Sequence, residues 1–348
     1  MSSAVEINDI KSVVSDPVCK ELFNSSVLIT GATGLIGSFF IKCLIELNKT
    51  QNANIKIYAL VRNEQKAKSI FGDAVSLVVS DIVNVKALDF EVDYIFHGAS
   101  ITSSKDMVEK PVETINIAIA GTQNMLNVAR EQKNLKAFVY MSSLEVYGVT
   151  PPDLKIITES DYGYIDQLSV RSSYSLGKRM VECLCVSYAS EYSVPVKIVR
   201  LTQTFGPGVA YNDGRVFADF ARCVIEGRNI ILHTKGETVR NYCYLSDAVT
   251  ALMTVAAKGE TGQAYNIANE DSDISIYDMA QMLCSFVPEK EIKVVIEDNG
   301  NAAKMGYNPT VKIKLGTAKL RALGWEAKVD LESMFKNLIE DMSCNRDR

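Results

Sequence analysis

The stretch SVLITGATGLIG, residues 26–37, joins a short strand to a glycine-rich loop and to the start of a helix. Residues 26–30 are mostly apolar or β-branched, which favours a buried strand. The glycines that follow let the backbone turn tightly and approach a ligand, and the N-terminus of the helix faces an anion such as a pyrophosphate. The pattern therefore predicts a dinucleotide-binding site. Its residues are Gly31, Thr33, Gly34, Leu35, Ile36 and Gly37.

Strand and helix patterns alternate on the C-terminal side of this loop. We expect strands at 26–30, 55–61, 76–79, 94–97, 137–141 and 196–201, and helices at 34–47, from 63 onward, at 107–132 and at 174–192. Buried strands that alternate with helices predict an α/β fold with a doubly wound parallel sheet, the Rossmann arrangement, whose ligand crevice lies at the carboxyl ends of the strands.

Beyond about residue 203 the alternation loosens. We expect helices at 216–226, 247–257, 277–286 and 331–342, with short strands at 230–232 and 264–267. We interpret 1–203 as a dinucleotide-binding domain, to which part of 236–270 returns. Residues 204–348 then form a smaller C-terminal α/β lobe that binds the substrate.

Composition excludes several classes of protein. The 348 residues have a net charge of -5, which disfavours nucleic acid and anionic membrane surfaces as partners. No apolar run approaches the roughly 20 residues that span a bilayer. The eight cysteines form no CxxC pair and only His97 and His233 supply imidazoles, so we expect no metal site. Reduced thiols, and a start that lacks the apolar core of a signal peptide, predict a cytoplasmic protein.

Tyr174 and Lys178 suggest the chemistry. Residues four apart share one face of a helix, and an ammonium beside a phenol favours the phenolate. Together with a hydroxyl such as that of Ser143, the pair can remove or return an alcohol proton. This suits hydride transfer at a neighbouring nicotinamide.

The remaining cofactor contacts follow the other strands. The second strand ends in Arg62, where an acid usually holds the adenosine ribose of NAD. We expect NAD, but Arg62 is suited to the 2′-phosphate of NADP, or it is a solvated residue at a helix start. Asp81 and Ile82 are expected near the adenine. Small residues expected beside the cofactor are Gly98, Ala99 and Ser100.

With these residues in place, the chain resembles the extended short-chain dehydrogenase/reductase family, the NAD-dependent epimerases and dehydratases of nucleotide sugars. The resemblance runs from about residue 25 to 340. It includes GATGLIG (31–37), the Tyr174/Lys178 pair, SSLEVYG (142–148), RLTQTFGP (200–207) and LGW (323–325). Residues 174–185 and 204–216 are most similar to UDP-glucuronate decarboxylases, also called UDP-xylose synthases.

The resemblance implies a role for each catalytic residue. Tyr174 takes the proton of the sugar 4-hydroxyl, Ser143 hydrogen-bonds the same oxygen, and Lys178 lowers the tyrosine pKa and holds the nicotinamide ribose. Asn116 matches an asparagine that orients the lysine through water. The resulting 4-ketone acidifies C5 or makes a C6 carboxylate prone to lose carbon dioxide, and the hydride then returns.

Other matched positions concern the rest of the sugar nucleotide. Glu145 is the expected acid or base near C5 or C6, although a purely structural carboxylate is the alternative, and Leu144 replaces a polar residue and counts against dehydration. Ser103 is expected at sugar hydroxyls. The nucleotide diphosphate is expected at Gln203, which replaces an asparagine, at Arg215 and at Arg240.

The favoured function is therefore a UDP-glucuronate decarboxylase-like enzyme. The alternatives are a 4-epimerase, a 4,6-dehydratase, an NADPH-dependent 4-ketoreductase and a non-catalytic dinucleotide-binding protein. By analogy with the family, the substrate is a nucleotide sugar, with a UDP-sugar favoured. The same analogy predicts a homodimer through helices 107–132 and 174–192.

Overall fold

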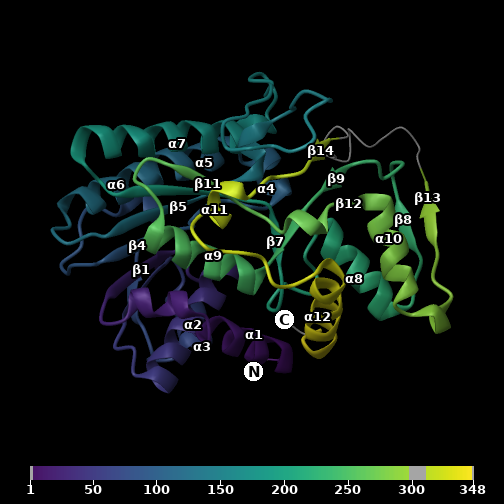
Figure 1. The fold of residues 1–348 in the computed structure, drawn as a ribbon, viewed down its shortest axis with the longest axis horizontal. Helices are drawn as coiled ribbons and strands as arrows, with labels where there is room; N and C mark the ends of the chain where they lie inside the picture. Colours follow the sequence, from purple (N-terminus) through teal and green to yellow (C-terminus); the bar gives the residue numbers. More distant parts are fainter. Residues whose placement is uncertain (1–2, 298–310, 347–348) are drawn as a thin grey trace.

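A computed structural model describes residues 3–297 and 311–346, and a seven-stranded parallel sheet lies at its centre (Figure 1). The strand order is β11-β6-β5-β4-β1-β2-β3. The strands are β1 (Ser26–Thr30), β2 (Lys56–Val61), β3 (Ser76–Val79), β4 (Tyr94–His97), β5 (Ala137–Ser143), β6 (Val196–Leu201) and β11 (Ala264–Ile267). The order reverses direction between β1 and β4, where a doubly wound sheet opens its ligand crevice. The predicted fold class is confirmed.

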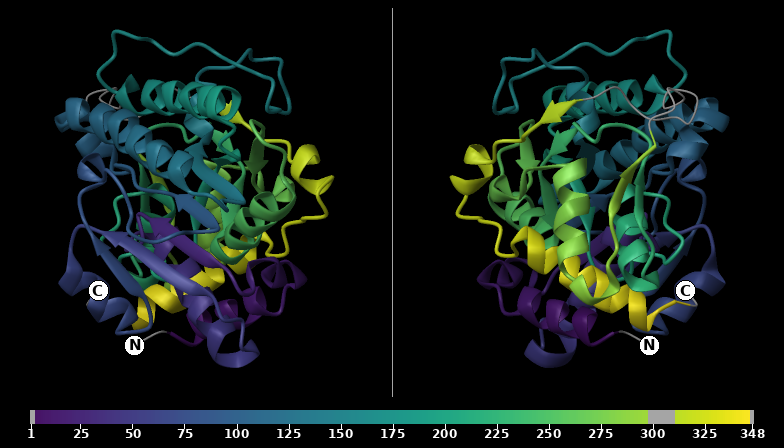
Figure 2. Two further views of the ribbon diagram at one scale, coloured as in Figure 1. Left: turned by 90° about the vertical axis from the view of Figure 1, so that its left-hand side faces the viewer. Right: turned by 90° about the vertical axis from the view of Figure 1, so that its right-hand side faces the viewer.

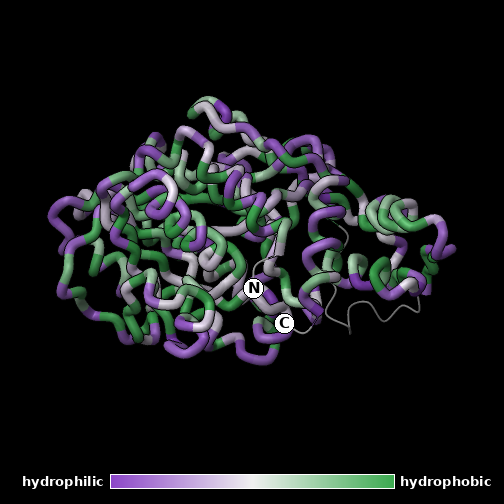
Figure 3. Tube along the Cα trace, turned by 90° about the horizontal axis from the view of Figure 1, so that it is seen from below, coloured by the Kyte–Doolittle hydropathy of each residue, from purple (hydrophilic) through white to green (hydrophobic). Residues whose placement is uncertain are grey.

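Both faces of the sheet are covered, which explains the continuous apolar strands. In β1, Val27 and Ile29 face one core and Leu28 faces the other. The first core lies under α2 (Leu35–Gln51), α3 (Glu64–Phe71) and α9 (Leu245–Lys258); the second lies under α6 (Thr122–Glu131) and α7 (Ser172–Tyr192). Hydrophobic residues gather in the interior of the trace and hydrophilic ones at its outer turns (Figure 3).

The expected single helix over 107–132 is wrong. The segment forms α4 (Ser104–Glu109), α5 (Pro111–Asn116), a π-helical turn η3 (Ile117–Gly121) and α6. Lys110 leaves the helical region, with φ -133° and ψ 55°, because the ring of the following proline disfavours helical backbone at the preceding residue. The π turn then shifts the helical register before α6 begins.

The C-terminal lobe has its own small core. Its helices are α8 (Val216–Glu226), α10 (Ile276–Ser285) and α12 (Leu331–Cys344), whereas the short α11 (Ala318–Arg321) packs on β11 of the large sheet. Its short strands are β7 (Gln203–Phe205), β8 (Ile230–Leu232), β9 (Val239–Arg240), β10 (Tyr242–Tyr244), β12 (Ile274–Ser275), β13 (Val294–Ile296) and β14 (Lys312–Ile313). Between β10 and β12 the chain crosses back, since α9 and β11 belong to the large sheet and its core.

Short helical turns complete the chain. They are η1 (Pro17–Leu22), η2 (Ile82–Asn84), η4 (Leu144–Tyr147), η5 (Glu270–Ser272) and η6 (Pro288–Lys290). The N-terminal helix α1 (Ala4–Val14) packs beside α12, where Ser3 Oγ donates a hydrogen bond to Asp341 (Figure 1). Residues 148–171 form a long excursion, in teal at the top of both views in Figure 2. Among the described residues, no helix is both long and apolar enough to cross a membrane.

Candidate active site

A cleft of about 640 Å³ lies at the carboxyl ends of the strands, between the large sheet and the C-terminal lobe. This volume is typical of a small-molecule or cofactor site. Most of the residues that the sequence singled out line it. They are Gly31, Thr33, Gly34, Leu35, Ile36, Gly37, Arg62, Asp81, Ile82, Gly98, Ala99, Ser100, Ser143, Glu145, Tyr174, Lys178, Gln203, Arg215 and Arg240.

The glycine loop has the geometry that a pyrophosphate needs. Gly31 has φ +68°, and a Cβ there would lie 2.8 Å from the carbonyl of Gly98. A Cβ on Gly37 would lie 2.4 Å from the carbonyl oxygen of Gly31, so neither position tolerates a side chain. The first turn of α2 has no side-chain cap at Gly34, which leaves its N–H groups for phosphate oxygens. The loop therefore fits a dinucleotide.

Tyr174 and Lys178 lie on the buried face of α7, with 9% and 3% of their surfaces exposed. Lys178 Nζ donates a 2.7 Å hydrogen bond to the carbonyl of Met141 in β5 and lies 5.7 Å from the centre of the Tyr174 ring. Burial lowers the pKa of Lys178 to about 8. The bond to β5 fixes the ammonium beside Tyr174.

The tyrosine pKa differs from the expectation. The pKa of Tyr174 is raised to about 12, chiefly by burial and next by the charge of Glu145. A hydrogen bond with Ser143 and the charge of Arg171 lower it. Lys178 is not among these causes, and the direction of the shift is opposite to the one expected from the spacing of Tyr174 and Lys178. The physical reason is that both side chains are desolvated together.

Glu145 is held by a residue that the sequence reasoning missed. Its two carboxylate oxygens accept from the two terminal nitrogens of Arg171, at 3.0 and 3.2 Å, and one of them also accepts from Ser175 Oγ at 3.0 Å. Arg171 directly precedes α7, three residues before Tyr174. That spacing, one helical turn before the tyrosine, is the signal that could have revealed it.

The C-terminal lobe contributes two arginines to the cleft. Arg240, in β9, has a buried Nε with no hydrogen-bond partner among the described residues. Arg215 is engaged by Asp213 through its Nε and one terminal nitrogen, at 2.7 to 3.2 Å. An unpaired buried donor is costly, so Arg240 is the better prepared of the two to take an anionic ligand.

Two predicted site residues do not line the cleft. Ser103 is exposed, and its hydroxyl accepts a hydrogen bond from the Asp106 N–H, which caps α4. Asn116 is exposed at the end of α5, just before the π turn.

Comparison with known proteins decides the family. The family model described as NAD dependent epimerase/dehydratase family matches residues 27–268. The chain belongs to this family. The resemblance that the motifs indicated is thus confirmed, and NAD is the cofactor for which the family is named.

Individual relatives carry out different reactions. A UDP-glucuronic acid decarboxylase of Arabidopsis thaliana is 31% identical over 320 residues, which cover 91% of this chain and 89% of the relative. A dTDP-D-glucose 4,6-dehydratase of Mus musculus is 28% identical over 331 residues, with 91% and 88% covered. The structure of UDP-glucose 4-epimerase with UDP-glucose from Thermotoga maritima has a TM-score of 0.77 at 21% identity, covering 92% of this chain and 100% of that one. The similarity to this epimerase structure shows that the two chains share a fold.

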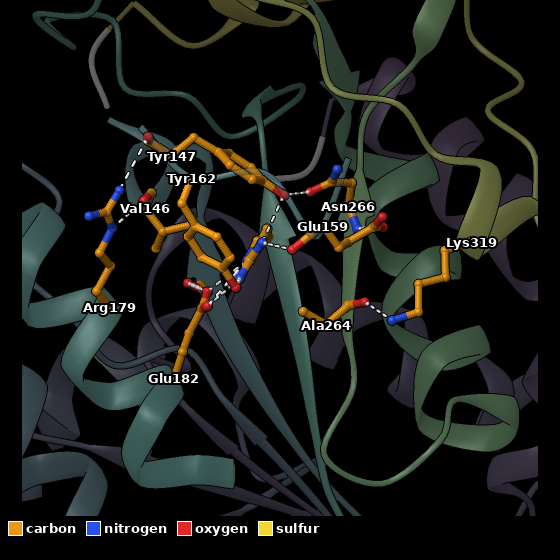
Figure 4. A network of polar contacts seen from close by, with 11 residues as sticks. Val146, Tyr147, Glu159, Tyr162, Arg179, Glu182, Ala264, Asn266 and Lys319 are labelled. Atoms are coloured by element: carbon orange, nitrogen blue, oxygen red, sulfur yellow. Dashed lines mark hydrogen bonds and ion pairs between the residues drawn. The ribbon is translucent and has the colours of Figure 1, made fainter. Parts of the chain in front are cut away.

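In this family member a buried polar network holds the catalytic helix. Arg200 in β6 donates three hydrogen bonds of 2.7 to 3.2 Å to the carboxylate of Glu182, one turn after Lys178. Glu182 also accepts from Ser142 Oγ, next to Ser143. Figure 4 shows Glu182 below Tyr147 and Tyr162, whose hydroxyls accept from Arg200 at 3.0 and 3.1 Å. The network fixes α7 against β5, and so positions Tyr174 relative to Ser143.

His97 is part of the scaffold. Its two ring nitrogens are hydrogen-bonded to Thr30 and Thr122, at 2.7 and 3.0 Å, and Ala99 N donates to the same Thr30 hydroxyl. Burial lowers the pKa of His97 to about 3, so the ring is neutral at physiological pH. Within residues 3–297 and 311–346, no three His, Cys, Asp or Glu side chains gather closely enough to bind a metal ion.

Proposed function

We propose that this protein is a nucleotide-sugar enzyme that oxidises the sugar at C4 and decarboxylates UDP-glucuronate. The observation that carries the proposal is Glu145, which lines the cleft with Tyr174 and is ion-paired to Arg171. The support from sequence is the 31% identity to UDP-glucuronic acid decarboxylases over 91% of the chain. This identity favours an acidic sugar as the substrate.

The first step rests on Tyr174 and Ser143. Tyr174 Oη accepts the proton of the 4-hydroxyl, and Ser143 Oγ hydrogen-bonds the same oxygen as it becomes a carbonyl. Lys178, held by the carbonyl of Met141, supplies a positive charge beside Tyr174, which becomes a neutral phenol as it takes the proton. A nicotinamide dinucleotide held by the glycine loop would supply the hydride acceptor for C4 and return the hydride afterwards, so it would not be consumed.

The second step follows from the 4-ketone. The C5–C6 bond then breaks, carbon dioxide leaves, and the electron pair forms an enolate with the C4 carbonyl, so no acid is needed to expel a leaving group. C5 takes a proton from water, relayed by Glu145, which is ion-paired to Arg171. Leu144 is apolar where a dehydration would need a proton donor. Arg171 uses two of its five N–H groups on Glu145, and its charge offsets the repulsion between Glu145 and a substrate carboxylate.

The nucleotide diphosphate binds at the arginines of the smaller lobe. The orphan Nε of Arg240 supports this assignment, since a phosphate oxygen would satisfy it. Gln203, in β7, lines the same end of the cleft. Arg215 contributes only if it releases Asp213.

A homodimer is part of the proposal. Large apolar side chains are exposed on the neighbouring helices α4, α5 and α7. They are Val108, Val112, Ile115, Met180 and Val186, with 41 to 73% of their surfaces exposed. Exposed apolar patches of this kind mark protein–protein contacts. Light scattering should give twice the chain mass, and Val112→Lys with Met180→Lys should yield monomers.

We also propose a cytoplasmic location. The support is that all eight cysteines are free, and five of them are buried. Such thiols are typical of a reducing compartment. Fractionation of cells that express the untagged chain tests this, and a secreted product would contradict it.

Mass spectrometry of the reaction products tests the central proposal. The purified protein is incubated in parallel with UDP-glucuronate, UDP-glucose and their N-acetyl relatives, and Tyr174→Phe serves as the inactive control. Loss of carbon dioxide from UDP-glucuronate supports the proposal. Loss of water from a neutral sugar identifies a dehydratase, and an unchanged mass with altered chromatography identifies an epimerase; either result refutes decarboxylation.

A further inference from the structure

The adenosine end of the cleft carries two cations where NAD-binding sites usually carry an acid. Arg62 follows β2 directly, and Lys66 lies in the first turn of α3, whose N-cap is Asn63. Both side chains line the cleft together with the glycine loop. In dinucleotide-binding folds, an acid at this point accepts hydrogen bonds from the ribose hydroxyls of NAD and repels a phosphate. Here the position offers only positive charge.

Neither cation is neutralised within the described parts of the chain. Glu64, the acid that lies between them in sequence, forms a 2.7 Å ion pair with Lys68. No ion pair of Arg62 or Lys66 occurs within residues 3–297 and 311–346. Both side chains are exposed, so they keep the freedom to reach a ligand.

The carboxylates that do line the cleft are already engaged elsewhere. Asp81 accepts from the Val83 N–H and caps η2, after the neighbouring strand β3. Glu145 and Asp213 are paired with arginines at the sugar end. None of these three acids stands after β2, where it would balance Arg62.

We infer that Arg62 and Lys66 form a binding site for the 2′-phosphate of a dinucleotide, so that this chain prefers NADP(H) to NAD(H). A guanidinium binds phosphate oxygens in pairs, and an ammonium adds a point charge to the same dianion. A free 2′-hydroxyl gives the two cations much less to bind. The inference concerns the cofactor alone, and it is independent of which sugar is the substrate.

Isothermal titration of the purified full-length protein with NAD⁺ and NADP⁺, at one ionic strength and without any sugar, tests the inference. NADP⁺ should bind about tenfold or more tightly than NAD⁺, since hydrogen bonds to charged groups are worth about that much. Arg62→Gln and Lys66→Gln should each weaken NADP⁺ binding severalfold and leave NAD⁺ binding almost unchanged. Arg62→Asp should reverse the preference.

Lys49→Gln is the control, because Lys49 is an exposed lysine near the end of α2 and is absent from the cleft wall. It should alter neither affinity. The preference should also shrink at high salt, since exposed ion pairs are screened. Tighter binding of NAD⁺ by the unaltered protein, or an equal loss for both nucleotides in Arg62→Gln, would overturn the inference. Because no sugar is present, such a failure leaves the proposed decarboxylation untouched.

Discussion

Arg171 donates to both carboxylate oxygens of Glu145, at 3.0 and 3.2 Å, and thereby joins the start of the catalytic helix to the turn after β5. The two side chains are about equally shielded, with 21% and 23% of their surfaces exposed. Their charges act on Tyr174 in opposite directions, since Glu145 raises the pKa of the phenol and Arg171 lowers it. The pair therefore tunes the proposed base as well as the site around it.

Opposite pH shifts should follow when either partner loses its charge. The base must be deprotonated to accept a proton, so kcat/KM rises with pH through the tyrosine pKa. Glu145→Gln removes a charge that raises this pKa and should move the rise to lower pH, whereas Arg171→Gln should move it to higher pH. Rate profiles on UDP-glucuronate measure both. Shifts in the same direction would contradict the electrostatic account.

Tyr174→Phe should abolish turnover and keep binding. The phenol oxygen is the proton acceptor, and loss of such a group costs about 10²- to 10⁴-fold in rate. Calorimetry should show cofactor affinity within about twofold of the unaltered protein, because the ring still fills its place. Tyr192→Phe, at the other end of α7, is the control and should keep full activity. Retained activity in Tyr174→Phe would refute the proposed base.

Removal of Arg200 should be strongly destabilising. Its side chain is 2% exposed and faces a carboxylate that is only 10% exposed, so Arg200→Met leaves Glu182 as a largely buried unpaired charge. The expected loss is about 3–5 kcal/mol of unfolding free energy. Urea denaturation measures it, with Lys336→Met in the exposed Lys336–Glu332 pair as a control that should cost less than about 1 kcal/mol. The double variant Arg200→Met with Glu182→Met should lose less than the sum of the two single variants.

Asp9→Asn should stabilise the protein at neutral pH. Burial raises the pKa of Asp9 from 3.8 to about 6, and the nearby acids Asp247, Asp341 and Glu6 add to the effect. Between these values the folded state binds more protons than the unfolded state, so this carboxyl reduces stability as pH rises from about 4 to 6.

The asparagine cannot ionise and can still accept the hydrogen bond from Tyr244. Its gain should reach up to about 3 kcal/mol at pH 7.5 and vanish near pH 4. Melting curves at several pH values test this, with the exposed Asp73→Asn as control. A gain that does not depend on pH would show that the raised pKa is not its origin.

The sequence predicted the parts of the site that depend on local pattern. SVLITGATGLIG indicates strand, turn and helix within twelve consecutive residues, and the spacing of Tyr174 and Lys178 places both on one helix face. The alternation of apolar strands with helices predicted the parallel sheet. Family motifs and strand ends then identified 19 of the residues in the cleft wall. Ser103 and Asn116 are the exceptions, since neither lines the cleft.

The tertiary structure decided which charges meet and how far they are desolvated. Glu145 and Arg171 are 26 residues apart, and Arg200 and Glu182 are 18 apart, so no periodicity of one element relates them. The pKa of Tyr174, about 12, likewise depends chiefly on burial, which exists only once α7 has packed on the sheet. Sequence spacing by itself determined the faces of each helix and strand, because those faces follow from backbone geometry. Contacts between elements, and the loss of water around them, exist only once the elements have packed.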